Sequence, residues 1–202
     1  IMKILKIGEA EDFLEKKGFN VARRGIAKNY NEALRISSKL GFPVALKVTN
    51  AIHKTKINGV RISNKDNLEE NFKQLRKKSP KILVQEYVDG LEIITGLKKD
   101  STFGHVVAFG LGGIYTEIIR DVSFRICPVE LKDVKEMMQE IKGYSLLKGY
   151  KDKKFNIKAI ENIILKLSKL AENNPNIEEL DINPLIVNNK EAKIVDARII
   201  IR

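Results

Sequence analysis

Two apolar runs near the carboxyl end of the chain contain oxygen-bearing side chains where a buried strand would normally repeat Ile, Val and Leu. The runs are residues 179–187 and 192–198, and the turn sequence Asn188-Asn189-Lys190 joins them. An amide or a carboxylate in such a run costs desolvation free energy unless a cation or hydrogen-bond donors meet it. The pattern therefore predicts two strand segments that contribute to one polar site.

Asn183 and Asp196 are the strongest candidates for ligands at this site. Mg²⁺ prefers a tight octahedron of oxygen ligands, of which the protein usually supplies one or two while water and phosphate oxygens supply the rest. Asp181 lies two residues before Asn183 and is expected on the same strand face, where it either supports a metal ligand or pairs with a lysine. The pattern is typical of a magnesium–nucleotide site.

Helical and strand patterns alternate along the chain without internal repeats. Residues 9–17 and 30–40 have helical spacing, and a glycine follows each of them as the expected helix stop. We expect an α+β architecture of two approximate lobes, residues 1–85 and 86–202, with a central antiparallel sheet, two helices after Val129 and two terminal strands. The strand patterns before these helices are residues 43–48, 59–62, 82–87, 92–98, 105–109 and 114–119.

The composition excludes several classes of protein. Hydrophobic residues make up 43% and charged residues 31% of the 202 residues. No apolar run approaches the roughly 20 residues that cross a bilayer and no leader sequence is recognisable, so we expect a cytoplasmic protein without a membrane partner. Cys127 is the single cysteine, which excludes an internal disulfide, and the two histidines are too widely separated for a zinc cluster.

The net charge of +11 raises the question of nucleic-acid binding. Its distribution argues against this function, because basic residues alternate with Glu and Asp on the helical stretches 65–78 and 130–142, a pattern typical of solvated faces. Aromatic residues make up only 6% of the chain and there is no tryptophan, so a base-stacking surface is not supported. We expect no nucleic-acid partner.

Several short blocks in one order along nearly the whole chain resemble a known family. They are residues 41–47, 52–55 with 58–60, 84–88, 109–113, 121–125, 146–150 and 181–185. On these blocks the chain resembles the beta subunit or beta domain of ADP-forming acetyl-CoA (acyl-CoA) synthetases, relatives of succinyl-CoA synthetase. The resemblance implies the ATP-grasp fold, a single domain over residues 1–202 whose two α/β lobes bind a nucleotide between them.

The resemblance also implies roles for individual residues. Lys47 is expected to contact the nucleotide phosphates, and Gly59 to lie in the small loop that closes over them. Glu86 and Val88 are expected to form the hinge on the adenine side, and Glu92 to meet the ribose. From spacing alone, an edge-strand lysine that discourages aggregation is the favoured explanation of Lys47. For the two glutamates, solvent-facing strand residues are an equally good explanation.

The metal and the catalytic residue follow from the same resemblance. Asn183 and Asp196 would hold Mg²⁺, and ATP or ADP would be the nucleotide. His53 stands where this branch has a histidine that relays the phosphoryl group from a phosphohistidine on the alpha subunit to ADP. Without the family pattern, a lone loop histidine would be interpreted as a surface residue. No coenzyme A-binding glycine fingerprint is recognisable, so we expect a hetero-oligomer with an alpha subunit or domain that supplies the coenzyme A-binding and phosphohistidine segments.

Some interpretations stay open at this point. The glycine-rich residues 110–113 form either a phosphate contact or a tight turn, and the charge cluster of Glu117, Arg120, Asp121 and Arg125 either positions phosphate or docks a partner subunit. His105 is interpreted as structural. Two rival functions are a regulatory acyl-CoA-synthetase-like module that binds a nucleotide or effector without chemistry, and another ATP-grasp carboxylate–amine ligase.

Overall fold

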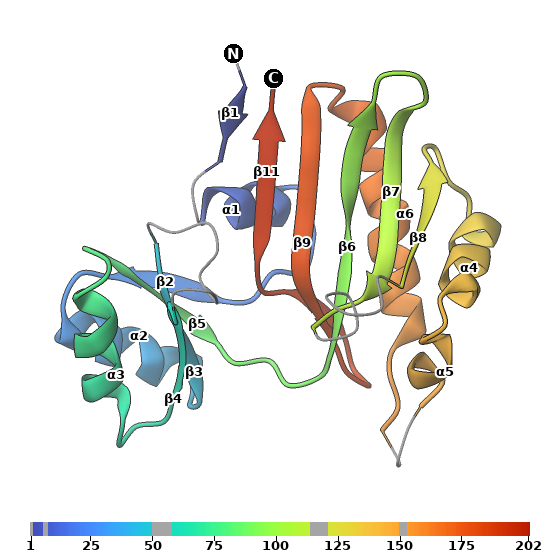
Figure 1. The fold of residues 1–202 in the computed structure, drawn as a ribbon. Helices are drawn as coiled ribbons and strands as arrows, with labels where there is room; N and C mark the ends of the chain where they lie inside the picture. The colour runs from blue at the N-terminus through green and yellow to red at the C-terminus, as the bar shows by residue number, and fades with distance from the viewer. Residues whose placement is uncertain (1, 6–7, 50–57, 114–120, 150–152) are drawn as a thin grey trace. The chain divides into compact units, whose positions relative to one another are not determined.

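The computed structural model describes residues 2–5, 8–49, 58–113, 121–149 and 153–202. The chain divides into two compact units, a smaller one of Ala22–Val88 and a larger one that combines Ile1–Val21 with Asp89–Arg202 (Figure 1). The amino-terminal segment therefore belongs with the second of the two expected lobes and not with the first. The reason is burial, because Leu14, Phe19 and Val21 pack in the hydrophobic core of the larger unit.

The smaller unit is a four-stranded antiparallel sheet in the order β2-β5-β3-β4, with two helices packed against it. Asn29 caps the first helix by accepting a hydrogen bond from the backbone N–H of Glu32, and Gly41, with a φ of 89°, ends it. The elements are β2 (Arg24–Ala27), α2 (Tyr30–Leu40), β3 (Val44–Val48), β4 (Val60–Ser63), α3 (Leu68–Arg76) and β5 (Ile82–Glu86).

Strand alternation gives the small sheet one apolar face toward its helices. Val44, Leu46 and Val48 of β3 and Val84 of β5 form a core with buried side chains of α2 and α3. Because successive strand residues point to opposite faces, the side chain of Lys47 leaves from the other face of this sheet.

The larger unit has a seven-stranded sheet in the order β1-β11-β9-β6-β7-β8, with β10 also paired to β9. Helix α6 packs against β6 and β7 on one face of the sheet (Figure 1). The elements are β1 (Lys3–Ile4), α1 (Glu9–Lys16), β6 (Leu91–Asp100), β7 (Gly104–Leu111), β8 (Val122–Ile126), α4 (Leu131–Glu140), α5 (Tyr144–Leu147), α6 (Ile157–Asn173), β9 (Ile177–Val187), β10 (Ala192–Ile194) and β11 (Ala197–Ile201).

The α+β class, the central antiparallel pairing and the two early helices are confirmed. The region after Val129 contains the short helix α5 in addition to two longer helices. The carboxyl-terminal region contains three strands where two were expected, because the run that starts at Ala192 breaks into β10 and β11. The expected strand 114–119 lies outside the described residues.

Gly96 occupies a position in β6 where the neighbouring strand leaves no room for a side chain. A Cβ atom there would lie 2.1 Å from the carbonyl oxygen of Leu180, so the backbone has to move. We expect Gly96→Ala to lower the free energy of unfolding by about 1–3 kcal/mol, measured by urea denaturation. The control is Gly104→Ala, where the φ of 76° costs strain but no atom lies within 4 Å. A smaller loss for Gly96→Ala than for this control would contradict the packing explanation.

Candidate functional site

Asn183 and Asp196, 13 residues apart in the sequence, are neighbours in the sheet. The backbone N–H of Asn183 donates a hydrogen bond to the carbonyl oxygen of Asp196 at 3.1 Å, and that of Val195 donates to the carbonyl oxygen of Pro184 at 3.2 Å. The two candidate ligands are therefore held at adjacent backbone positions by the sheet itself.

This arrangement arises where β9 changes partner. Strand β9 pairs with β10 up to Leu185 opposite Ile194, and with β11 from Ile182 opposite Ala197. The break between β10 and β11 lies opposite residues 183–184. The break brings two polar residues into an otherwise apolar sheet region at one point.

The side chains of Asp181 and Asn183 lie on one face of β9. Leu180 and Ile182 are buried in the core, whereas Asp181 and Asn183 are exposed. Alternation therefore turns the amide and this carboxylate to the same side, as expected.

Other charges surround Asp181. Its side chain is exposed, but the flanking strands limit its hydration, and this desolvation is the main cause that raises the pKa of Asp181. The negative charges of Glu179 and Asp196 raise that pKa further, and Arg198 opposes them. A bound cation would lower the electrostatic free energy of this group of carboxylates.

The donor set fits a hard divalent cation. The metal-ligating atoms of Asn183 and Asp196 are the amide oxygen and the carboxylate oxygens, which suit Mg²⁺ rather than a metal that prefers nitrogen or sulfur. Within the described ranges, no three His, Cys, Asp or Glu side chains are grouped so that they could hold a metal ion by themselves. Two protein ligands completed by phosphate oxygens and water fit both observations.

Lys47 lies on β3 in the interior of the small sheet, between β5 and β4. Only 7% of its surface is exposed. An edge-strand lysine that discourages aggregation would be solvated and would lie on an outer strand. The position and burial of Lys47 therefore exclude that explanation and fit a lysine that meets a specific anion.

Gly59 lies beside the end of β3. Its carbonyl oxygen accepts a hydrogen bond from the backbone N–H of Val48 at 2.9 Å. Lys47 and Gly59 are therefore close to each other at one end of the sheet. His53 falls in residues 50–57, which lie outside the described residues, so its role stays a prediction.

The carboxylate of Glu86 is engaged by the protein. One oxygen accepts the backbone N–H of Arg23 at 2.9 Å, and the other accepts the Nε–H of Arg23 at 2.7 Å. A contact of Glu86 with an adenine base would then come from its main chain. Val88 lies two residues after the end of β5 and is half-buried.

Glu92 is exposed on β6, and its backbone lies against Gly112 of the run 110–113. Its carbonyl oxygen accepts the backbone N–H of Gly112 at 2.8 Å. A Cβ atom at Gly112 would lie 2.9 Å from the Cβ of Glu92, and one at Gly110 would lie 2.6 Å from the carbonyl oxygen of Asp121. Close approach of neighbouring backbone therefore accounts for both glycines, without a phosphate contact.

Two members of the predicted charge cluster make local contacts. Arg125 forms a double hydrogen bond with the carboxylate of Glu140, and Asp121 accepts the backbone N–H groups of residues 142–143. The other two members lie outside the described residues. His105 shares a hydrogen bond of 2.7 Å with the carbonyl oxygen of Ile177, in agreement with its structural interpretation.

Gln85 was not singled out from the sequence. It is 1% exposed on β5, and its Nε2 atom has no hydrogen-bond partner in the described parts of the chain. The sequence signal was a polar residue inside the apolar run Ile82-Leu83-Val84, but only the sheet register shows which face it occupies.

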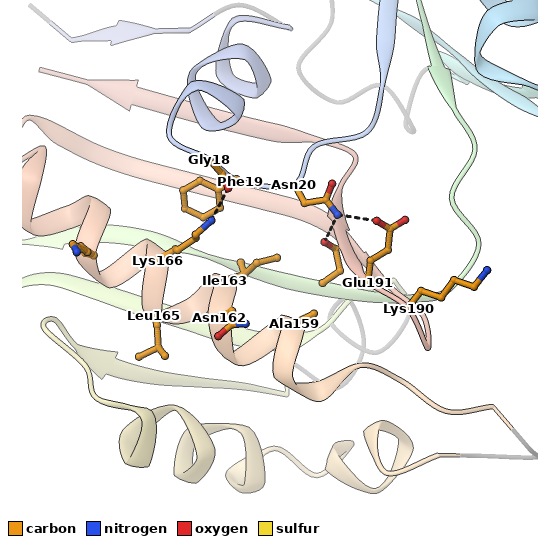
Figure 2. Close-up of a pocket in the computed structure, with 12 residues that line it drawn as sticks. Gly18, Phe19, Asn20, Ala159, Asn162, Ile163, Leu165, Lys166, Lys190 and Glu191 are labelled. Atoms are coloured by element: carbon orange, nitrogen blue, oxygen red, sulfur yellow. Dashed lines mark hydrogen bonds between the residues drawn. The ribbon is translucent and has the colours of Figure 1, made fainter.

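A hollow of about 490 Å³ lies elsewhere in the larger unit, between the segment 18–20, α6 and the turn after β9 (Figure 2). Lys166 of α6 donates a hydrogen bond to the carbonyl oxygen of Gly18, and Asn20 donates to Glu191 and to the carbonyl oxygen of Ala192. These contacts hold the amino-terminal segment in place. None of the predicted site residues that the structure describes lines this hollow.

A comparison with protein families agrees with these observations. The family model of the ATP-grasp domain matches residues 2–201. The chain belongs to the ATP-grasp family. The resemblance noted in the sequence and the expected ATP-grasp fold are confirmed. No helix in the described part of this ATP-grasp chain is long and apolar enough to span a membrane.

Curated relatives indicate which group of the ATP-grasp family the chain resembles. The chain is 38% identical over 208 residues to the beta subunit of ADP-forming acetate–CoA ligase I of Pyrococcus furiosus, covering 96% of this chain and 90% of that one. It is also 38% identical over 221 residues to ADP-forming acetate–CoA ligase I of Archaeoglobus fulgidus, covering all of this chain and 32% of that protein. The chain thus spans about a third of the longer relative and corresponds to the beta part of this group.

Solved structures agree with this placement. Acetyl-coenzyme A synthetase 1 of Ca. Korarchaeum cryptofilum, in complex with coenzyme A, Ca-AMPCP and HgCl⁺, matches with a TM-score of 0.92 and 36% identity over 99% of this chain and 94% of that one. A second structure of that protein, with coenzyme A and Mg-AMPPCP and with its phosphohistidine segment pointing towards the nucleotide binding site, matches with a TM-score of 0.86 and 36% identity over 99% and 93% of the two chains.

Proposed function

We propose that the chain is the nucleotide-binding beta part of an ADP-forming acyl-CoA synthetase. The full reaction interconverts acyl-CoA, ADP and phosphate with the free acid, ATP and coenzyme A. The observation that carries the proposal is the adjacency of Asn183 and Asp196 in the sheet of an ATP-grasp chain, at 3.1 Å between backbone atoms. A regulatory module without chemistry is less well supported, because the similar curated chains are ligases.

In this proposal Asn183 and Asp196 hold Mg²⁺, which would neutralise charge on the nucleotide phosphates. Lys47 contributes a buried positive charge toward the same phosphates, and the loop that contains Gly59 covers them. Phosphoryl transfer depends mainly on such positioning and charge neutralisation. Most of the net charge of +11 lies in residues 22–88, which would favour association with a polyanion.

The nucleoside end would be bound by the segment around Glu86 and Val88 and by Glu92. The main chain of the first two residues would meet the adenine, because the carboxylate of Glu86 is held by Arg23. The carboxylate of Glu92 is exposed on β6 and would accept hydrogen bonds from ribose hydroxyl groups.

His53 is proposed to carry the phosphoryl group. The N–P bond of the phosphohistidine on the alpha part breaks as an N–P bond to His53 forms. The second bond then breaks as an oxygen of the ADP β-phosphate attacks, which gives ATP and returns the imidazole. Such covalent catalysis divides one difficult transfer into two steps.

A partner would supply the coenzyme A-binding and phosphohistidine segments. The similar beta subunit of Pyrococcus furiosus and the complexes of the Korarchaeum protein with coenzyme A support this expectation. We propose a hetero-oligomer, or one longer polypeptide, in the cytoplasm.

Label transfer tests the proposal. The wild-type chain is mixed with its candidate alpha partner, ATP labelled at the γ-phosphate and Mg²⁺, and we expect label on histidine as acid-labile, base-stable phosphate. EDTA should abolish the labelling, because the metal neutralises the transferred group. A chain that binds nucleotide but leaves both parts unlabelled would refute the relay.

A further inference from the structure

The small sheet carries a buried amide whose hydrogen-bonding capacity the described protein does not satisfy. Gln85 is 1% exposed, and its Nε2 atom has no hydrogen-bond partner among the described residues. Burying an unpaired amide N–H costs free energy. Some other buried polar side chains avoid this cost, as Ser63 does by accepting from Asn71 and Ser123 by donating to the carbonyl oxygen of Met137.

The sheet register gives the face on which this amide lies. Gln85 stands opposite Ala45 on β3, and Lys47 lies two residues beyond Ala45 on the same strand. Directly paired residues and residues two apart share a face, so Gln85 and Lys47 are on the same side. This is the side of the sheet opposite α2 and α3, because Val84 belongs to the core under these helices.

Lys47 and Gln85 lie at different positions along their strands, so they would contact different parts of a nucleotide. Lys47 stands opposite Leu83, and Gln85 is two residues further along β5 toward Val88. Two strand residues span roughly 7 Å. Gln85 thus lies between the proposed phosphate contact and the proposed adenine hinge, where a nucleoside and not a terminal phosphate would be expected.

We infer that Gln85 is a nucleotide-binding residue that donates a hydrogen bond from Nε2 to an acceptor atom of the purine base. The inference rests on the proposed function and adds to it a side chain that recognises the base by a hydrogen bond. A neutral amide would orient the base through a directional hydrogen bond without adding charge, whereas Lys47 would supply the positive charge for the phosphates. This donor, which has no partner in the described part of the chain, then gains one when the nucleotide binds.

The test compares Gln85→Met with wild type and with Gln74→Met. The substitution keeps the approximate volume of the side chain and removes the amide. Gln74 is a matched control on α3, whose Nε2 donates to Glu70 at 3.0 Å. The affinities for ADP and AMP are measured by calorimetry, with AMP as a competitor of ADP, and the melting temperature is measured without nucleotide.

We expect Gln85→Met to weaken ADP and AMP binding by the same factor, about 5- to 20-fold, and the control to change either by less than about twofold. The nucleotide-free melting temperature of Gln85→Met should be equal to or above that of wild type, because the unpaired donor is gone. If Gln85 were needed only for the fold, its replacement would lower the melting temperature of the nucleotide-free protein.

Three results would overturn the inference: wild-type ADP affinity in Gln85→Met, a clearly larger loss for ADP than for AMP, or a lowered melting temperature without nucleotide. The second would move the contact to the terminal phosphate, and the third would make Gln85 a structural residue. Failure of the wild-type chain to bind ADP would instead refute the proposed function, and the inference with it.

Discussion

Asp196→Ala and Asn183→Ala should each abolish magnesium-dependent nucleotide binding and lower the rate of phosphoryl transfer by about 100- to 1,000-fold. The sheet hydrogen bond between these residues joins main-chain atoms, so the substitutions remove the oxygen ligands and leave the strand pairing in place. A site with two protein ligands cannot lose one without a large loss of metal affinity. Calorimetric titration of ADP with and without Mg²⁺ measures the effect.

Asn189→Ala is a suitable control, because Asn189 is exposed in the turn between β9 and β10. It should bind Mg-ADP like wild type, and circular dichroism should show that all three variants are folded. A magnesium-dependent gain in ADP affinity of wild-type size in either ligand variant would show that the cation is held elsewhere.

His53→Ala should leave ADP binding within about threefold of wild type and remove at least about 99% of phosphoryl transfer to ADP in the presence of the alpha partner. The reason is that the histidine would be a covalent carrier, and loss of a residue that acts in a catalytic unit costs orders of magnitude in turnover. The measurement is the rate of ATP formation from the phosphorylated alpha part.

His105→Asn is the control for this substitution, since His105 is the other histidine of the sequence and contacts only a carbonyl oxygen of β9 among the described contacts of its ring. It should retain phosphoryl transfer. Full activity of His53→Ala would favour the rival interpretation, an ATP-grasp ligase that forms an acylphosphate directly without a histidine relay.

Local patterns predicted most elements of the fold. The helix of residues 30–40 was marked by its spacing and by Gly41, and the alternation around Lys47 correctly indicated a strand. The adjacency of Asn183 and Asp196 could also be anticipated, because both lie in apolar runs joined by a short turn. These features depend on residues close in sequence, which is why a single sequence contains them.

Features that depend on distant residues were not predictable in this way. The sequence gives no sign that Arg23 would engage both oxygens of Glu86, 63 residues away. Nor does it show that residues 1–21 pack with the larger unit, because such packing depends on which apolar surfaces meet in three dimensions. The site of Gln85 needed the register of β3 and β5, which periodicity alone does not fix.

The discontinuity of the larger unit has a consequence for biosynthesis. Residues 22–88 form one uninterrupted segment, so every strand of the smaller sheet is available as soon as Val88 has left the ribosome. The larger sheet pairs Lys3 with Ile201 and cannot close before residue 201 has been made. Until then β1 lacks its partner strand, and a premature stop after Val88 would leave the smaller unit complete and the larger one incomplete.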